Sequence, residues 1–135
     1  MSPQRGGSQT TQLLETMLQD HQIKPNEIDL IAISSGPGSF TGLRIGCLIA
    51  KAWSFVHKTT LVAVPTHQLV AEQARYHLPP NTIIGVATDA QRKELFVSRW
   101  SLSQNRTTEL SPISIVQSGE LDQEHWLAML GPEPA

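Results

Sequence analysis

A glycine-rich stretch, GPGSFTGLRIG at residues 36–46, restricts the fold of this chain more than any other part of it. The apolar run Ile28–Ser34 precedes this stretch, and an apolar helical pattern follows it to about His57. Gly36 and Gly38 allow the backbone to turn through conformations that a side chain would forbid, and Pro37 stiffens the turn. The sequence therefore predicts a buried strand, a tight turn and a helix in direct succession, an arrangement typical of α/β proteins.

The same turn has the composition of an anion site. Ser39 or Thr41 can cap the following helix with its hydroxyl group, and the remaining unpaired N–H groups of the first helical turn would then face an incoming anion. We therefore expect Gly36, Gly38, Ser39 and Thr41 to lie close to an anion or to a nucleotide phosphate.

The rest of the chain alternates between helical and extended patterns, which predicts an α/β class. The first expected helix starts near Ser8 or Thr10, either of which could cap it, and Pro25 lies beyond its end. This helix is expected over 8–22, with Leu13, Leu14, Met17 and Leu18 on one face, and strands are expected over 28–34 and 61–64, on either side of the helix that follows the turn. A further helix is expected from Thr66, as its cap, to about His77. The remaining expected elements are a hairpin with extended runs over 82–88 and 94–100, a strand over 111–117 and a short helix over 119–129.

A stripe of small residues runs along the helix that follows the turn. Gly42, Gly46 and Ala50 recur every four residues, so they share one face and permit the close approach of another helix. Larger apolar residues lie beside the stripe, so most of this helix must be covered. Burial in the chain's own core and docking of another protein both explain the stripe, and the pattern by itself favours neither.

Few residues of the sequence are arranged for independent catalysis. The five histidines include no pair spaced i, i+4 on one helix, so no HExxH or HxxxH metal site is expected, and each is assigned to the surface or to a helix end. Ser39 lacks the glycine two residues later that a nucleophile elbow requires. Cys47 is the single cysteine, so an internal disulfide is excluded, and we expect a small buried hydrophobe there.

Charge and hydropathy argue against two further classes of protein. The formal net charge is −2 and the ten Lys and Arg residues are scattered, so strong direct binding to a phosphate backbone is not expected. The longest apolar stretch, Leu43–Val56, contains Arg44 and Lys51 and is too short to span a bilayer. We expect a soluble protein of the reducing cytoplasm.

Two segments carry a resemblance to a known family. The stretch over 36–46 resembles the signature of the TsaB (YeaZ) family, and Thr88–Phe96 resembles the Asp-Ala-Arg…Glu-Val-Tyr hairpin that opens the second lobe in that family. The resemblance covers about Leu13 to Trp100 and implies an incomplete actin/Hsp70-like (ASKHA, ribonuclease H-like) lobe over 8–80, followed by the start of a second lobe over 81–135. The family's first strands, with their Asp-Thr-Ser turn, have no counterpart here, so we expect either a start upstream of Met1 or a degenerate paralogue.

The resemblance also implies a function. Members of this family are non-catalytic partners or activators of a TsaD-type enzyme in the synthesis of threonylcarbamoyladenosine (t6A) on tRNA. By resemblance, the helices over 8–22 and 41–57 would form the interface, through Leu13, Leu14, Met17, Gly42, Gly46, Ala50 and Trp53. ATP and a metal would be bound by the partner and not by this chain, and tRNA would be contacted only indirectly. The family also allows a TsaE-type ATPase and a second copy of the chain as partners. Relatives have been described as glycoproteases, but this sequence contains no metal ligands and no activated nucleophile that would support protease activity.

Two alternatives stay open from the sequence. The first is a nucleotide-dependent phosphotransferase or hydrolase of the same superfamily that uses residues 36–41 and Asp89 around a phosphate, although a turn aspartate bonded to nearby amides explains Asp89 more simply. The second is a degenerate paralogue that forms homodimers, through its helices or through an open sheet edge.

Overall fold

The computed structural model describes residues 7–120, and these form two compact units. Unit 1 contains the described residues up to Ser35 together with Ser39–Val64, and unit 2 contains Gly36–Gly38 and the residues from Pro65 onward. The sequence predicted a boundary between two lobes near residue 80, whereas the two compact units of the structure meet in the sequence between Val64 and Pro65. The difference arises because the helix after Pro65 packs on the sheet that follows it in the sequence.

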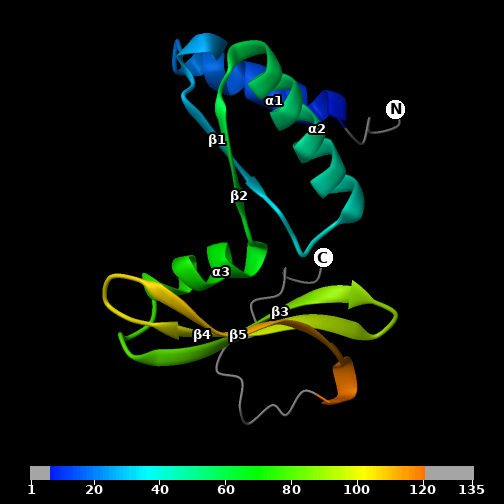
Figure 1. Cartoon of the computed structure of the whole chain (residues 1–135), viewed down its shortest axis with the longest axis vertical. Coiled ribbons are helices and arrows are strands. Elements are labelled where there is room, and N and C mark those ends of the chain that lie inside the picture. The colour runs from blue at the N-terminus through cyan, green and yellow to red at the C-terminus, as the bar shows by residue number, and fades with distance from the viewer. Residues whose placement is uncertain (1–6, 121–135) are drawn as a thin grey trace. The chain divides into compact units, whose positions relative to one another are not determined.

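Unit 1 is a helix followed by a β-α-β unit (Figure 1). Its elements are α1 (Gly7–Asp20), a 3-10 turn (Pro25–Glu27), β1 (Leu30–Ser34), α2 (Phe40–His57) and β2 (Thr60–Val64). The two strands pair in parallel with Ala32 opposite Val62, so α2 forms the crossover that parallel neighbours need. The predicted strand–turn–helix succession is confirmed, although β1 begins two residues later than expected.

Helix α2 has a defined cap at each end. The Ser39 hydroxyl accepts a hydrogen bond from the Gly42 N–H at 3.3 Å, so Ser39 is the cap and Thr41 lies inside the helix. At the other end Lys58 is left-handed, with φ of 59°, and its N–H donates to the Ser54 carbonyl at 2.8 Å. No helix in the described part of the chain is long and apolar enough to cross a membrane.

Unit 2 consists of one helix on a three-stranded antiparallel sheet of order β3-β4-β5 (Figure 1). Its elements are α3 (Thr66–Arg75), β3 (Thr82–Gln91), β4 (Glu94–Leu102), β5 (Thr107–Gln117) and a 3-10 turn (Ser118–Glu120). The predicted hairpin is confirmed, and β5 begins four residues earlier than expected. Thr66 does not cap α3, because Pro65 holds that position, and most of the helix predicted over 119–129 lies outside the described residues. Ser8 and Thr10, the predicted caps of α1, lie within that helix.

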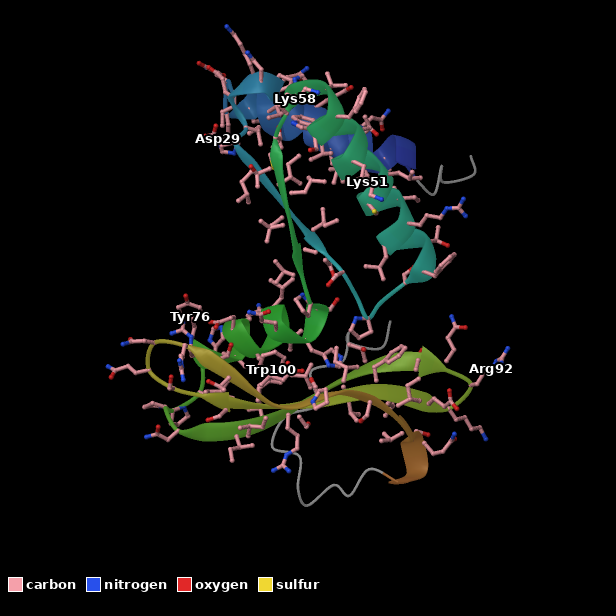
Figure 2. All side chains as sticks on the ribbon, in the orientation of Figure 1. Asp29, Lys51, Lys58, Tyr76, Arg92 and Trp100 are labelled. Carbon is pink, nitrogen blue, oxygen red and sulfur yellow. The ribbon has the colours of Figure 1, made fainter. Side chains whose placement is uncertain are left out.

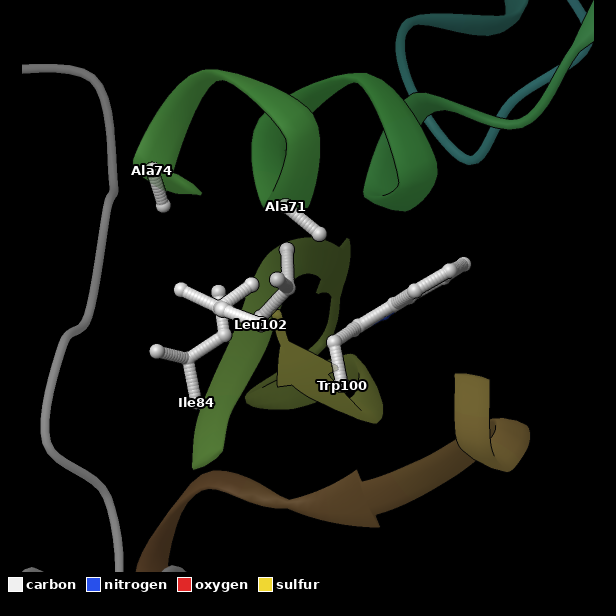
Figure 3. Packing of buried hydrophobic residues seen from close by; sticks show 6 residues of the cluster. Ala71, Ala74, Ile84, Trp100 and Leu102 are labelled. Carbon is white, nitrogen blue, oxygen red and sulfur yellow. The ribbon is translucent and has the colours of Figure 1, made fainter. Parts of the chain in front are cut away.

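The core of unit 2 lies between α3 and the sheet. Ala71 and Ala74 point from the helix toward Ile84, Trp100 and Leu102 on the strands (Figure 3). All five are at most 5% exposed. The two alanines allow the helix to lie close to the larger strand residues, and each large apolar side chain buried there stabilises the fold by about 1.5–3 kcal/mol.

Candidate functional site

Unit 1 contains an apolar hollow between its helices and β1. The hollow has a volume of about 390 Å³. Leu14, Met17 and Leu18 line it from α1, and Gly46, Ala50 and Trp53 line it from α2. Consecutive residues of β1, from Leu30 to Ile33, line it as well.

Two residues of the small-residue stripe of α2, Gly46 and Ala50, line this hollow, whereas Gly42 is exposed. Ala50 is 3% exposed and lies within unit 1, so its side chain is not on an outer surface. A Cβ atom built on Gly46 would meet nothing within 4 Å, whereas one built on Gly42 would lie 3.6 Å from the side chain of Ser39. Gly46 and Ala50 therefore point into unit 1, but the room above Gly46 is not filled by another helix.

Trp53, which lines the hollow, carries a buried polar atom without a partner. Its indole Nε1 is buried and has no hydrogen-bond partner among the described residues. The indole ring lies 5.4 Å from the ring of His57. A buried donor without an acceptor costs about 1–3 kcal/mol, so an acceptor that reached this N–H would gain that free energy.

Further apolar side chains of α1 and α2 are exposed, and one of them, Met17, also lines the hollow. Leu48 and Phe55, which are seven residues apart on α2, are 60% and 78% exposed, and Val56 is 67% exposed. On α1, Leu13 is 65% exposed and Met17 is 51% exposed, whereas Leu14 is half-buried. We call these five exposed residues, Leu13, Met17, Leu48, Phe55 and Val56, the outer apolar surface. Large exposed apolar side chains that gather on one face, as Leu48 and Phe55 do on α2, mark interaction sites more often than solvent-facing structure.

The charged residues around this surface on α2 are all basic. Arg44 and Lys51 are exposed on α2, and Lys58 follows its last turn, with its ammonium group 5.2 Å from the centre of the Phe55 ring. Figure 2 shows Lys51 and Lys58 projecting from this region of unit 1. The helix contains no Asp or Glu. The rim would therefore attract a surface that combines apolar side chains with carboxylates.

The five residues predicted to lie near an anion are divided between the two units. Ser39 and Thr41 belong to unit 1, whereas Gly36, Gly38 and Asp89 belong to unit 2. The Ser39 hydroxyl is engaged by the Gly42 N–H, and the Gly36 carbonyl accepts the Thr66 N–H at 2.8 Å. These bonds hold the turn in shape, with Gly36 at a φ of 98°.

Asp89 has a local role in the hairpin. Its carboxylate Oδ1 accepts the Gln91 N–H at 2.7 Å. The three residues of the turn, Gln91 to Lys93, all have positive φ angles, of 68°, 53° and 65°. The aspartate thus stabilises a turn that side chains disfavour, which is the simpler of the two roles considered from the sequence.

The described residues contain no group of three or more His, Cys, Asp or Glu side chains that could hold a metal ion. Cys47 is half-buried, as an apolar cysteine of α2 would be.

The buried histidine of unit 2 was not predicted from the sequence. His67 was assigned to the surface or a helix end; it does lie in the first turn of α3, but it is 0% exposed. Its Nδ1 lies 2.7 Å from the Ser98 hydroxyl and its Nε2 lies 3.0 Å from the Thr88 hydroxyl. The Trp100 Nε1 donates to the same Ser98 oxygen at 2.7 Å. A signal was present in the sequence, because His67 shares the i, i+4, i+7 spacing of Ala71 and Ala74 on the buried helix face.

Burial lowers the pKa of the His67 imidazole from its ordinary value. The neutral ring has one donor and one acceptor nitrogen, and the two hydroxyl groups can satisfy both in either tautomer. A second, part-buried contact ties α3 to β5, where the Glu72 carboxylate accepts bonds from the Thr107 hydroxyl at 2.7 Å and from the Arg75 guanidinium at 2.9 Å. Both bonds lower the pKa of Glu72, and the bond from the Thr107 hydroxyl has the larger effect.

Comparison with known proteins gives one family. The family model described as "TsaD: tRNA N6-adenosine threonylcarbamoyltransferase" matches residues 7–118. The protein named tRNA threonylcarbamoyladenosine biosynthesis protein TsaB in Bacillus subtilis (strain 168) is 25% identical over 117 residues, which cover 87% of this chain and 48% of that protein. The protein of the same name in Haemophilus influenzae is 32% identical over 88 residues, which cover 64% of this chain and 36% of that protein.

The fold is also that of a solved structure. YeaZ from Pseudomonas aeruginosa superposes with a TM-score of 0.71 at 21% sequence identity, over 81% of this chain and 51% of that one. This chain thus spans about half the length, or less, of the relatives and of the structure that it matches. The likeness confirms the expected α/β architecture.

Proposed function

Since the chain belongs to the TsaD family, among its TsaB/YeaZ members, we propose that it is a non-catalytic partner subunit that activates a TsaD-type transferase in t6A synthesis on tRNA. Two relatives that match most of the chain's length are named for this biosynthesis. This chain would present a docking surface, and its partner would carry out the transfer reaction.

The observation that carries the proposal is the outer apolar surface. Leu48 and Phe55 occupy one side of α2, more than half exposed, and basic residues surround them. Aromatic and aliphatic side chains of this kind supply most of the binding energy in protein interfaces, while charges at the rim guide the encounter. We expect the partner to offer an apolar groove rimmed by Asp and Glu.

The proposed interface differs in part from the one expected by resemblance. Leu13 and Met17 keep their predicted place in it, because both are exposed. Ala50 is buried and Gly46 faces the hollow, so we propose that these two shape unit 1 and do not touch the partner. Trp53 and Leu14, which line the hollow, would support the surface from below.

The cofactors belong, in this proposal, to the partner. ATP and a metal would be bound by the TsaD-type subunit, tRNA would be contacted mainly by other subunits, and the complex would work in the cytoplasm. Titration of the chain alone with Mg-ATP in a calorimeter tests this assignment. Heat at micromolar nucleotide would instead favour the phosphotransferase alternative, although the turn at 36–41 already uses Ser39 as a helix cap.

The central experiment measures binding of the chain to the TsaD-type protein of the same organism by calorimetry. Phe55→Ala should weaken binding by about tenfold to a hundredfold, as removal of an anchoring aromatic does. Tyr76→Ala is the matched control, because Tyr76 is 75% exposed and lies 4.6 Å from the Arg75 guanidinium, much as Phe55 lies near Lys58. Lys51→Glu should slow association, most strongly at low salt.

Two results would contradict the proposal. One is the absence of binding between the wild-type chain and the TsaD-type protein. The other is an equal loss of affinity in Phe55→Ala and Tyr76→Ala, since Tyr76 lies on unit 2 and outside the proposed surface.

A further inference from the structure

Lys58, which follows the last turn of α2, has a backbone conformation that disfavours a side chain. Its φ angle is 59°, in the left-handed region, and its N–H donates to the Ser54 carbonyl at 2.8 Å. Glycine is the usual residue at such a helix end, because a Cβ atom is strained there. The backbone alone would therefore favour glycine at this position, and the lysine is explained by what its side chain contacts.

Hydrogen bonds on both sides of Lys58 hold its backbone in place. The Ser54 hydroxyl donates to the Thr59 carbonyl at 2.6 Å, and the Thr59 hydroxyl donates to the Ile28 carbonyl at 3.1 Å. Thr59 is 4% exposed, so the residue that follows Lys58 is fixed inside unit 1. These bonds determine the direction in which the Lys58 side chain leaves the end of the helix.

The Lys58 side chain lies back over the last turn of α2. Its ammonium group is 5.2 Å from the centre of the Phe55 ring, within the distance of a cation–π contact. Phe55 is 78% exposed, so its ring has little packing of its own to keep it in one rotamer. The contact with the ammonium group therefore restricts a ring that would otherwise be free to change its orientation.

From these contacts we infer that Lys58 is a positioning residue for the docking of the TsaD-type partner. Its ammonium group holds the Phe55 ring in the orientation in which the ring enters the groove of the partner. The ring is then ordered before the partner arrives and loses less conformational freedom on binding. This role rests on the proposed function, because Phe55 serves there as an anchor of the interface.

The decisive variant is Lys58→Gly, because it should lower affinity without lowering stability. Glycine suits the left-handed backbone, so the midpoint of urea unfolding should stay the same or rise. The dissociation constant for the TsaD-type protein, measured by calorimetry, should rise about threefold to tenfold, since the Phe55 ring must then be ordered on binding. Lys58→Arg keeps a cation near the ring and should bind within about twofold of the wild type.

A double-mutant cycle separates an effect through Phe55 from a direct contact with the partner. Lys58→Gly should add nothing to the loss caused by Phe55→Ala, because the ring on which the lysine acts is absent. Arg44→Met is the matched control for the lost charge. Arg44 is exposed on the same helix, about 16 Å from Phe55 along its axis, so its effect should add in full to that of Phe55→Ala.

Proton NMR of the free chain provides a measurement that needs no partner. The side-chain protons next to the Lys58 ammonium group should be shifted upfield by the Phe55 ring, and the shift should disappear in Phe55→Leu. Unshifted Lys58 protons would overturn the positioning role and leave the docking proposal intact.

The binding and unfolding measurements can overturn the same role in three further ways. These are an unchanged affinity of Lys58→Gly, a lower unfolding midpoint of this variant, and full additivity of its effect with that of Phe55→Ala. Each would leave the docking proposal intact, because the wild type would still bind. A wild-type chain that does not bind the TsaD-type protein would instead overturn the proposed function, and the role of Lys58 with it.

Discussion

The two units contain similar elements but differ sharply in how they are packed. Of the nine buried hydrophobic residues among the described residues, only Ala50 lies in unit 1 and the other eight lie in unit 2. Unit 1 contains a hollow of about 390 Å³ lined by apolar side chains. Protein interiors rarely tolerate an opening of that size, whereas interaction surfaces do. The difference shows that unit 2 has a closed core of its own, whereas the described residues do not fill the apolar hollow of unit 1.

The same difference holds for polar groups. In unit 2 the Trp100 Nε1 and both nitrogens of His67 have hydrogen-bond partners. In unit 1 the Trp53 Nε1 is buried without one. The helix and three-stranded sheet of unit 2 provide hydrogen-bond partners for these buried polar groups, whereas the two strands and two helices of unit 1 leave one such group without a partner.

The strongest test of the comparison is a large-to-small change in each unit. Leu102→Ala should destabilise unit 2 by about 2–5 kcal/mol, because Leu102 is 0% exposed and a cavity would remain. Leu48→Ala, on the outer apolar surface, should change the stability of unit 1 by less than about 0.5 kcal/mol. Urea unfolding checks both, with Trp100 as the fluorescence probe of unit 2 and Trp53 as that of unit 1, each in a background in which the other two of the chain's three tryptophans are replaced by Phe. Similar losses in the two variants would break the comparison.

A smaller effect is expected from the hydroxyl at the centre of the polar network. Ser98→Ala leaves the Trp100 N–H and His67 Nδ1 without their common partner, which should cost about 1–3 kcal/mol. Ser101→Ala, on the same strand but outside the network, is the control and should be nearly neutral. The readout is again urea unfolding of unit 2. A neutral Ser98→Ala would mean that water or a rearranged side chain satisfies these groups.

The pH dependence of unit 2 should follow from His67. Burial lowers its pKa in the folded state, so the unfolded chain, with a pKa near 6.5, takes up the proton first as the pH falls. The stabilising contribution of the neutral ring is therefore fully present above about pH 6.5 and is lost below it, by at most about 1.4 kcal/mol per pH unit for one proton. Unfolding of wild type and His67→Gln between pH 8 and pH 5 measures it. A variant with the same pH slope as the wild type would exclude His67 as the cause.

The smallest effect should be a gain in unit 1. Gly46 lies within α2 and a Cβ there would meet nothing within 4 Å. Gly46→Ala should therefore stabilise unit 1 by about 0.5–1 kcal/mol through its higher helix propensity. The Trp53 fluorescence reports the unfolding. Destabilisation by this change would mean that the stripe is already packed against another segment, and the hollow would then not be open.

The sequence predicted the local features of the fold well and the direction of its surfaces poorly. The strand–turn–helix succession, the Ser39 cap and the hairpin over Asp89 depend on residues a few positions apart, and all three are present. The resemblance to a family, carried by the same stretch, was confirmed by the comparisons. His67, assigned to the surface or to a helix end, does lie in the first turn of α3 but is buried. Gly46 and Ala50 of the small-residue stripe, for which burial and docking had both been left open, line the hollow of unit 1. In both cases the spacing of residues showed which of them share one face of the helix, but it did not show which other segment covers that face.

The sequence by itself determined the turn at Gly36 and limited the cap of α2 to Ser39 or Thr41, because a positive φ and a hydroxyl cap act within one turn of backbone. Only the tertiary structure decided that His67 lies inside unit 2, since its partner Ser98 is 31 residues away. It also decided that Gly46 and Ala50 of α2 line a hollow while Leu48 and Phe55 face solvent. Burial depends on which distant segments reach a surface, and no pattern within one helix contains that information.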